Sequence, residues 1–137
     1  MGPKESGRVM EKKTILVVDD EKEIVNAIKQ ELEESHYEVL TAYNGLEGLE
    51  KARKEGPDLV ILDLMLPKID GYKVCGLLKR DTGYAGIPIL MLTAKAHEED
   101  KKLAEVMGAD AYLTKPFERE VLFSKIQELI GLPTPNP

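Results

Sequence analysis

Five polar side chains in this sequence lie at or just past the end of a short apolar run. They are Asp19, Asp20, Asp63, Thr93 and Lys115. A short, continuous apolar run is typical of a strand that is buried in a parallel sheet. Parallel strands of an open α/β sheet end at one edge, and ligands bind at that edge. We therefore expect these side chains to lie close together.

The acidic members of this set favour a divalent cation. Three carboxylates in one pocket repel one another, and one of them would have to bind a proton unless a cation lies between them. Mg²⁺ suits such a pocket because it prefers oxygen ligands and combines a few carboxylates with waters and phosphate oxygens. The sequence predicts a magnesium site formed by Asp19, Asp20 and Asp63, and the backbone carbonyl of Met65 is close enough in sequence to add a ligand.

The same set contains the groups that phosphoryl transfer requires. Asp63 is the best candidate nucleophile, because carboxylates form acyl phosphates in this chemistry. Lys115 supplies a compact cation for one phosphoryl oxygen, and Thr93 supplies a hydroxyl donor for another. Ala94 leaves space beside Thr93 for the transferred group. The product is reactive, so the modification would be temporary.

Composition narrows the class of protein. The chain has 137 residues, of which 42% are hydrophobic and 32% charged, which favours one soluble globular domain over a disordered chain. Its net charge of −6 argues against direct binding to nucleic acid. No apolar run is long enough to span a membrane, and the single cysteine, Cys75, cannot form an internal disulfide. We expect a cytoplasmic protein.

Strands and helices are predicted to alternate five times around the polar set. The expected strands are Thr14–Val18, Tyr37–Ala42, Leu59–Leu62, Ile87–Leu92 and Ala111–Thr114. A pattern with apolar residues three or four apart follows each strand and predicts a helix. Such alternation predicts parallel strands joined by right-handed crossovers, with helices on both faces of the sheet. We divide the chain into a flexible leader (1–13), one folded domain (14–131) and a tail or truncated linker (132–137).

The helix ends can also be assigned. Asn44-Gly45 resembles a hairpin turn, but the apolar residues that follow have helical spacing, so we expect a helix to begin there. Asp70 is expected to cap the next helix. Gly56 and Gly108 fit the left-handed position that ends a helix. The fourth helix is expected to span about His97–Met107 and the last helix Phe117–Ile130.

Together, these motifs resemble the response-regulator receiver domain of two-component signalling, the CheY-like superfamily. The resemblance covers residues 14–130. It is carried by Val17-Val18-Asp19-Asp20, Leu62-Asp63-Leu64-Met65-Leu66-Pro67 with Asp70-Gly71, Leu92-Thr93-Ala94, and Tyr112-Leu113-Thr114-Lys115-Pro116-Phe117. It implies a flavodoxin-like, doubly wound sheet of five parallel strands in the order 2-1-3-4-5.

The resemblance also implies a reaction and its parts. A sensor histidine kinase, a phosphotransfer protein or a small donor such as acetyl phosphate would transfer a phosphoryl group to Asp63 with Mg²⁺ as cofactor. Asp20 would bind the metal directly and Asp19 mostly through water. The Lys115–Pro116 peptide bond would be cis. Pro67 and Gly71 would have structural roles in the loop after Asp63.

Switching is a further implication of the resemblance. Thr93 would move toward the phosphoryl group and Tyr112 would swing inward. The surface formed by the fourth helix, the fifth strand and the fifth helix would then change and control an output partner or domain. A homodimer through this surface is a hypothesis. No membrane contact and no direct nucleic-acid binding are expected for this segment.

Other interpretations compete with a signalling switch. One is a Mg²⁺-dependent phosphatase with an aspartyl nucleophile, but such enzymes resemble one another in an Asp-x-Asp motif after the first strand. This sequence has Asp19-Asp20-Glu21-Lys22 there. Another is an unphosphorylated, receiver-like binding module. Taken singly, an aspartate pair can cap a helix, Lys115 can be a solvated charge and Tyr112 can be ordinary packing.

Overall fold

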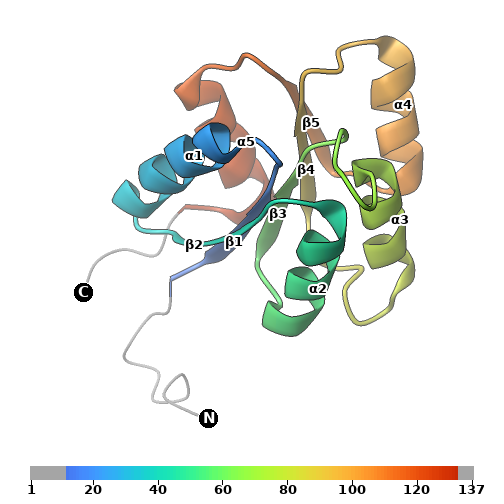
Figure 1. The fold of residues 1–137 in the computed structure, drawn as a ribbon. Helices are drawn as coiled ribbons and strands as arrows, with labels where there is room; N and C mark the ends of the chain where they lie inside the picture. Colours follow the sequence, from blue (N-terminus) through green and yellow to red (C-terminus); the bar gives the residue numbers. More distant parts are fainter. Residues whose placement is uncertain (1–11, 133–137) are drawn as a thin grey trace.

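The computed structural model describes residues 12–132, in which five strands alternate with five helices (Figure 1). The strands are β1 (Thr14–Val18), β2 (Glu38–Ala42), β3 (Leu59–Leu62), β4 (Ile89–Thr93) and β5 (Ala111–Thr114). The helices are α1 (Lys22–Glu34), α2 (Gly45–Glu55), α3 (Gly71–Arg80), α4 (Glu98–Met107) and α5 (Arg119–Ile130). All neighbouring strands pair in parallel, in the order β2-β1-β3-β4-β5. This confirms the predicted doubly wound α/β fold.

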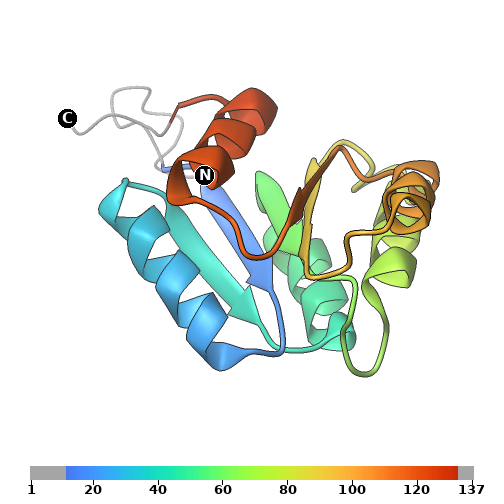
Figure 2. The same ribbon diagram turned by 90° about the horizontal axis from the view of Figure 1, so that it is seen from above.

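Helices α1 and α5 cover one face of the sheet, and α2, α3 and α4 cover the other (Figure 2). Successive residues of a strand point to opposite faces. In β1, Leu16 and Val18 join the core beneath α2, α3 and α4, whereas Ile15 and Val17 join the core beneath α1 and α5. A sheet covered on both faces explains why its strands read as continuous apolar runs.

Burial differs between the centre of the sheet and one of its edges. Every residue of β3 and β4 is buried, and only the first residue of β1 is not. By contrast, all four residues of β5 are only half-buried. The polar groups that follow β1 and β3 therefore emerge from the best-packed part of the molecule, while Lys115 emerges from its looser edge.

Asn44 begins helix α2, so the Asn-Gly pair is not a hairpin turn. The side chain of Asn44 accepts a hydrogen bond from the N–H of Glu47 at 2.8 Å. In return, the carboxylate of Glu47 accepts from the N–H of Tyr43 at 2.8 Å. These reciprocal bonds satisfy the N–H of Glu47, which the first turn of the helix leaves without a partner, and the N–H of Tyr43 just before the helix. The predicted helix start is confirmed.

Two glycines hold the loop that follows β3. A Cβ on Gly45 would overlap the carbonyl oxygen of Ile69, and a Cβ on Gly71 would overlap the carbonyl oxygen of Asp63. In addition, the N–H of Gly45 donates to the carbonyl of Pro67 at 3.0 Å. Only glycine allows backbones to approach so closely. The loop is thus held against the start of α2 through Pro67 and Ile69, and its two ends meet where Gly71 contacts Asp63.

The other predicted helix ends are confirmed as well. Asp70 caps α3 by accepting a hydrogen bond from the N–H of Lys73 at 2.9 Å. Gly56 and Gly108 follow α2 and α4 with φ angles of 57° and 109°, in the left-handed region. No helix between residues 12 and 132 is long and apolar enough to cross a bilayer.

Some element boundaries differ from expectation. Strand β4 begins two residues later than predicted, because the N–H of Ile87 donates to the carbonyl of Tyr84 and so belongs to a turn. Helix α5 begins two residues later, because Glu118 is extended and precedes its first turn. Lys13, assigned to the leader, accepts a hydrogen bond from Glu38 through its carbonyl. The rest of the leader and tail lies almost entirely outside the described residues.

Candidate functional site

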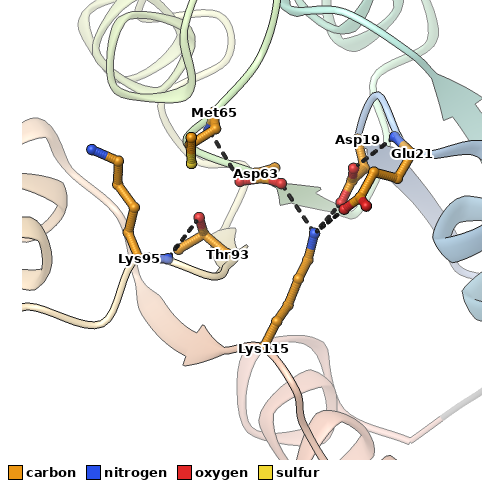
Figure 3. Close-up of polar contacts among 7 residues, drawn as sticks. All are labelled: Asp19, Glu21, Asp63, Met65, Thr93, Lys95 and Lys115. Atoms are coloured by element: carbon orange, nitrogen blue, oxygen red, sulfur yellow. Dashed lines mark hydrogen bonds and ion pairs between the residues drawn. The ribbon is translucent and has the colours of Figure 1, made fainter.

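Asp19, Asp63 and Lys115 meet at the carboxyl edge of the sheet. The Nζ atom of Lys115 lies 2.6 Å from Oδ2 of Asp19 and 3.0 Å from Oδ2 of Asp63 (Figure 3). Only 4%, 8% and 11% of the side-chain surfaces of Asp19, Asp63 and Lys115 are exposed. Two carboxylates and one ammonium group therefore share a largely buried pocket, where electrostatic interactions are stronger than in bulk water.

The register of the sheet explains this arrangement. Strands β1 and β3 are neighbours, and Val18 pairs with Leu62, so the residues that follow them emerge side by side. Lys115 follows β5, which is separated from β3 by β4, and its long side chain spans that distance. The N–H of Lys115 also donates to the carbonyl of Thr93 at 2.8 Å, which fixes the root of the side chain.

Each buried carboxylate is oriented by its own backbone. Oδ1 of Asp63 accepts a hydrogen bond from the N–H of Met65 at 3.0 Å, and Oδ1 of Asp19 accepts from the N–H of Glu21 at 2.9 Å. Such bonds to the residue two positions ahead are typical of aspartate at a turn. The second oxygen of each carboxylate is then left to contact Lys115.

Burial and ion pairing act in opposite directions on these groups. Burial raises the pKa of Asp19, and its hydrogen bond with Lys115 offsets part of that shift. Burial alone would lower the pKa of Lys115, but hydrogen bonds to Asp19 and Asp63 outweigh it and leave the pKa above 10.5. Lys115 is therefore a cation at neutral pH, and it neutralises part of the acidic pocket.

Glu21 is a member of the acidic group that was not predicted from the sequence. Asp19, Glu21 and Asp63 each offer a carboxylate oxygen, and these oxygens lie within 4.8 Å of one another. Glu21 Oε1 also lies 3.5 Å from Lys115 Nζ. Asp20, in contrast, is exposed and lies outside this group. In the sequence, Glu21 is the third consecutive acidic residue after β1. An acidic residue at that position is also typical of the start of a helix, so the pattern does not by itself indicate a role in the site.

Three carboxylate oxygens at this spacing form a donor set that suits a hard divalent cation such as Mg²⁺. The backbone of Met65 lies at the same rim, tied to Asp63 by its N–H, while 57% of the Met65 residue surface is exposed. Asp19 and Asp63 of the predicted set thus fit a magnesium site together with Glu21, whereas Asp20 lies outside this group.

Thr93 and Tyr112 both contact the loop between β4 and α4. Thr93 is fully buried, and its hydroxyl accepts from the N–H of Lys95 at 3.4 Å. The hydroxyl of Tyr112 donates to the carbonyl of Lys95 at 2.7 Å. Burial raises the pKa of Tyr112 to about 12, so this hydroxyl is a donor at neutral pH. The two predicted switch residues therefore hold one loop from two neighbouring strands.

A groove of about 450 Å³ opens beside the site, between α1 and the loop after β5. Its lining is mostly apolar and includes Ile24, Ala27 and Phe117. It also reaches Lys115, so a partner in this groove would contact the acidic pocket. The peptide bond between Lys115 and Pro116, at the floor of the groove, is cis.

Comparison with known proteins agrees with this geometry. A family model described as the response regulator receiver domain matches residues 15–127. The chain is 48% identical over 118 residues to the alkaline phosphatase synthesis transcriptional regulatory protein PhoP of Bacillus subtilis. That match covers 86% of this chain and 48% of PhoP, so the chain spans about half the length of that relative. It is also 34% identical to protein PilG of Pseudomonas aeruginosa, covering 88% of this chain and 90% of PilG.

The solved structures give the same result. A putative response regulator from Chloroflexus aurantiacus superimposes with a TM-score of 0.82 and 36% sequence identity, covering 86% of this chain and 97% of that one. The matching fold, the family model and the curated relatives together show that this chain belongs to the response regulator receiver domain family of two-component signalling.

Proposed function

We propose that Asp63 accepts a phosphoryl group from a sensor histidine kinase or a phosphotransfer protein, and that the modification changes the α4–β5–α5 surface. The observation that carries this proposal is the contact of Lys115 with both Asp63 and Asp19, all three side chains being largely buried. A buried carboxylate beside a fixed ammonium group, at the edge where α/β sheets bind ligands, is suited to phosphoryl transfer.

The transfer step forms one bond and breaks one. An oxygen of the Asp63 carboxylate attacks phosphorus, and the P–N bond to the donor histidine breaks as the imidazole leaves with the electron pair. The ammonium group of Lys115, already 3.0 Å from Asp63, neutralises charge on a phosphoryl oxygen. The hydroxyl of Thr93 turns from Lys95 to donate to another phosphoryl oxygen.

Asp63, Asp19 and Glu21 would hold Mg²⁺ in this proposal, with Asp20 and the carbonyl of Met65 as the further ligands predicted from the sequence. When bound, the ion offsets the negative charge of the carboxylates and of the incoming phosphoryl group. The reaction should consequently require a divalent cation, and chelation with EDTA should stop it.

Labelling with radioactive acetyl phosphate in the presence of Mg²⁺ tests the proposal. The expected result is about one phosphoryl group per chain, with none in an Asp63→Asn variant. Sustained release of phosphate over many turnovers would favour the phosphatase interpretation instead. A folded protein that takes up no label would favour the binding-module interpretation.

We also propose that the kinase binds in the groove between α1 and the loop after β5. An apolar groove that reaches Lys115 would bring a donor histidine close to Asp63. Ala27 lines this groove, is exposed and lies on α1, so an Ala27→Arg substitution fills the groove without disturbing the core. Its neighbour Asn26 is also exposed but does not line the groove.

Comparison of two donors separates kinase binding from chemistry. Ala27→Arg should slow transfer from a phosphorylated kinase by at least about tenfold, because a charged side chain occupies the groove. Labelling by acetyl phosphate should stay at the wild-type rate. Asn26→Arg is the matched control and should affect neither reaction. Equal slowing by Ala27→Arg and Asn26→Arg would contradict a specific role for the groove.

The output surface is proposed from the exposed side of α4. Leu103 and Val106 are 45% and 80% exposed, and such apolar residues on one helix are available to a partner or a second copy. We propose a phosphorylation-dependent homodimer through α4, β5 and α5. Sedimentation with Mg²⁺ and beryllofluoride should show a dimer at micromolar concentration that Val106→Glu abolishes. A monomer under these conditions would contradict the proposed dimer but not the proposed phosphoryl transfer.

A further inference from the structure

Tyr72 and Asp100 join the starts of two helices. Tyr72 is the second residue of α3, and Asp100 is the third residue of α4. The hydroxyl of Tyr72 donates to Oδ1 of Asp100 at 3.0 Å and lies 3.4 Å from the backbone carbonyl of Asp100. Further along, Cys75 Sγ lies 3.5 Å from the carbonyl of Met107, so the two helices pack together over their length. The polar bond lies at the end nearest the acidic pocket.

On the α3 side, Tyr72 is joined through its neighbour Gly71 to the loop that follows β3 and contains Asp63, called here the phosphoacceptor loop. Its neighbour Gly71 lies so close to the carbonyl of Asp63 that a Cβ would overlap that oxygen. The N–H of Gly71 also donates to the carbonyl of Leu64 at 2.9 Å. A displacement of the backbone after Asp63 must therefore displace the first turn of α3, which carries Tyr72.

On the α4 side, Asp100 lies in the first turn of α4, just past the loop that Thr93 and Tyr112 hold. The Nζ atom of Lys95 lies 3.9 Å from Oδ1 of Asp100, and the carbonyl of Lys95 accepts the hydroxyl of Tyr112. The Asp100 side chain is only 17% exposed, so its interactions are partly protected from water. The start of α4 thus has two attachments, one through the loop after β4 and one through Tyr72.

We propose that Tyr72 is a positioning residue that connects the phosphoacceptor loop to the start of α4 through its hydrogen bond to Asp100. This route runs through α3 and is separate from the route through Thr93 and Tyr112. The proposal has two parts, and only the second, the response of α4 to modification of Asp63, rests on the proposed function. Its first part, the attachment of α4 to α3, holds in the unmodified protein.

The chemistry of the pair supports this role. Burial, followed by the hydrogen bond to Asp100, raises the pKa of Tyr72 to about 12, so its hydroxyl keeps its proton at neutral pH. Hydrogen bonds to charged acceptors are stronger than neutral ones. A Tyr72→Phe substitution removes this bond and leaves the ring, which packs against the core beneath α2, α3 and α4.

Amide hydrogen exchange of the unmodified protein tests the attachment. The N–H of Lys101, which donates to the carbonyl of His97, reports on the first turn of α4. Tyr72→Phe should speed its exchange by about fivefold, because one hydrogen bond to a charged group is lost. Tyr84→Phe is the matched control, since Tyr84 is half-buried against the same core. It should leave the exchange of Lys101 unchanged.

Two comparisons decide whether the effect belongs to this bond. In an Asp100→Ala background, Tyr72→Phe should cause a clearly smaller acceleration than in the wild type, because the carboxylate acceptor is already absent and only the longer contact with the backbone carbonyl at 3.4 Å remains. The N–H of Val25 in α1 should exchange at the wild-type rate in all variants. An equal acceleration in α1, or an additive effect of the two substitutions, would overturn the proposal.

The second part is tested with Mg²⁺ and beryllofluoride as the phosphoryl mimic. In the wild type, this mimic should change the exchange of the first turn of α4, and Tyr72→Phe should reduce that change by at least about half. Uptake of label from acetyl phosphate should stay near one per chain in Tyr72→Phe. If the wild type takes up label but the mimic changes the exchange of α4 equally in Tyr72→Phe and the wild type, the role of Tyr72 is contradicted and the proposed function stands. If the wild type takes up no label, the proposed function fails instead.

Discussion

The ammonium group of Lys115 lies 2.6 Å from the carboxylate of Asp19, although the two residues follow strands at different places in the sheet. The same group lies 3.0 Å from Asp63. Before any divalent cation binds, the acidic pocket already holds one positive charge. A metal ion that enters must share these carboxylate oxygens with Lys115, so the lysine both prepares the pocket and competes for it.

Replacement of Lys115 by methionine should therefore strengthen Mg²⁺ binding. Removal of a nearby positive charge lowers the electrostatic cost of binding a second cation. After screening by solvent, we expect the affinity for Mg²⁺ to rise by about tenfold. Isothermal titration calorimetry measures this affinity, and circular dichroism verifies that the variant is folded. Lys115→Arg keeps the charge and should bind Mg²⁺ about as tightly as the wild type. Weaker binding by Lys115→Met would contradict competition between the lysine and the metal ion.

Gly45→Ala should destabilise the protein strongly. The added Cβ would overlap the carbonyl oxygen of Ile69, which is backbone and cannot rotate away. We expect a loss of about 3 kcal/mol or more in the free energy of unfolding, since overpacking of this kind forces backbone shifts. Urea denaturation measures this free energy. Gly86→Ala is the control, because a Cβ at Gly86 would meet open space, and it should change stability by less than about 0.5 kcal/mol.

Lys68→Gly should stabilise the protein. Lys68 has a φ of 74° in the loop after β3, and a left-handed conformation costs an ordinary residue about 1–2 kcal/mol. Glycine avoids that cost but has greater freedom in the unfolded chain, so we expect a net gain of about 0.5–1 kcal/mol. Lys73→Gly, at an exposed position within α3, should instead lose about 1 kcal/mol. Thermal denaturation of both variants in parallel tests whether their stabilities change in opposite directions.

Cys75 should make the protein less stable as the pH rises above 9. Burial raises the pKa of its thiol from 9.0 to about 11, with a smaller opposing effect of Lys79. Between these values the unfolded chain has lost the proton while the folded chain keeps it, so stability falls as the pH rises. The fall should be about 1 kcal/mol between pH 9 and pH 10.

The control for this effect is Cys75→Ala, studied over the same range of pH by urea denaturation. Its stability should fall less steeply between pH 9 and pH 10 than that of the wild type. Loss of stability above pH 10.5 should persist in this variant, because there the unfolded chain loses the proton of Lys115 while the folded chain, in which the pKa of this group is raised, keeps it. Identical slopes for the two proteins between pH 9 and pH 10 would show that the thiol ionises freely in the folded state.

The central part of the site was predictable because it depends on sheet topology. An apolar run followed by a carboxylate places Asp63 at the end of a buried strand, and the parallel arrangement brings Asp19 and Lys115 to the same edge. Caps such as Asn44 and Asp70 were predictable because their interactions are local in sequence. These features follow from periodicity and from turn chemistry.

Other features depend on side-chain directions that periodicity does not determine. Glu21 follows β1 at a position suited to a helix start, and only the three-dimensional path of the chain turns its carboxylate toward Lys115. The bond between Tyr72 and Asp100 joins residues 28 positions apart on two different helices. The left-handed φ of Lys68 carries no sequence signal, because lysine is not a residue that favours this region.

Strand β5 is half-buried at each of its four positions, whereas β3 beside the acidic pocket is buried throughout. A strand whose side chains are only partly enclosed leaves a smaller cavity when it is displaced, and cavities add to the cost of disturbing a core. We therefore expect the sheet to resist displacement at β3, which Asp63 follows, and to shift more easily at β5, which contains Tyr112 and precedes Lys115. A displacement that begins at the buried strands would thus be accommodated mainly at β5, the edge strand beside α4 and α5.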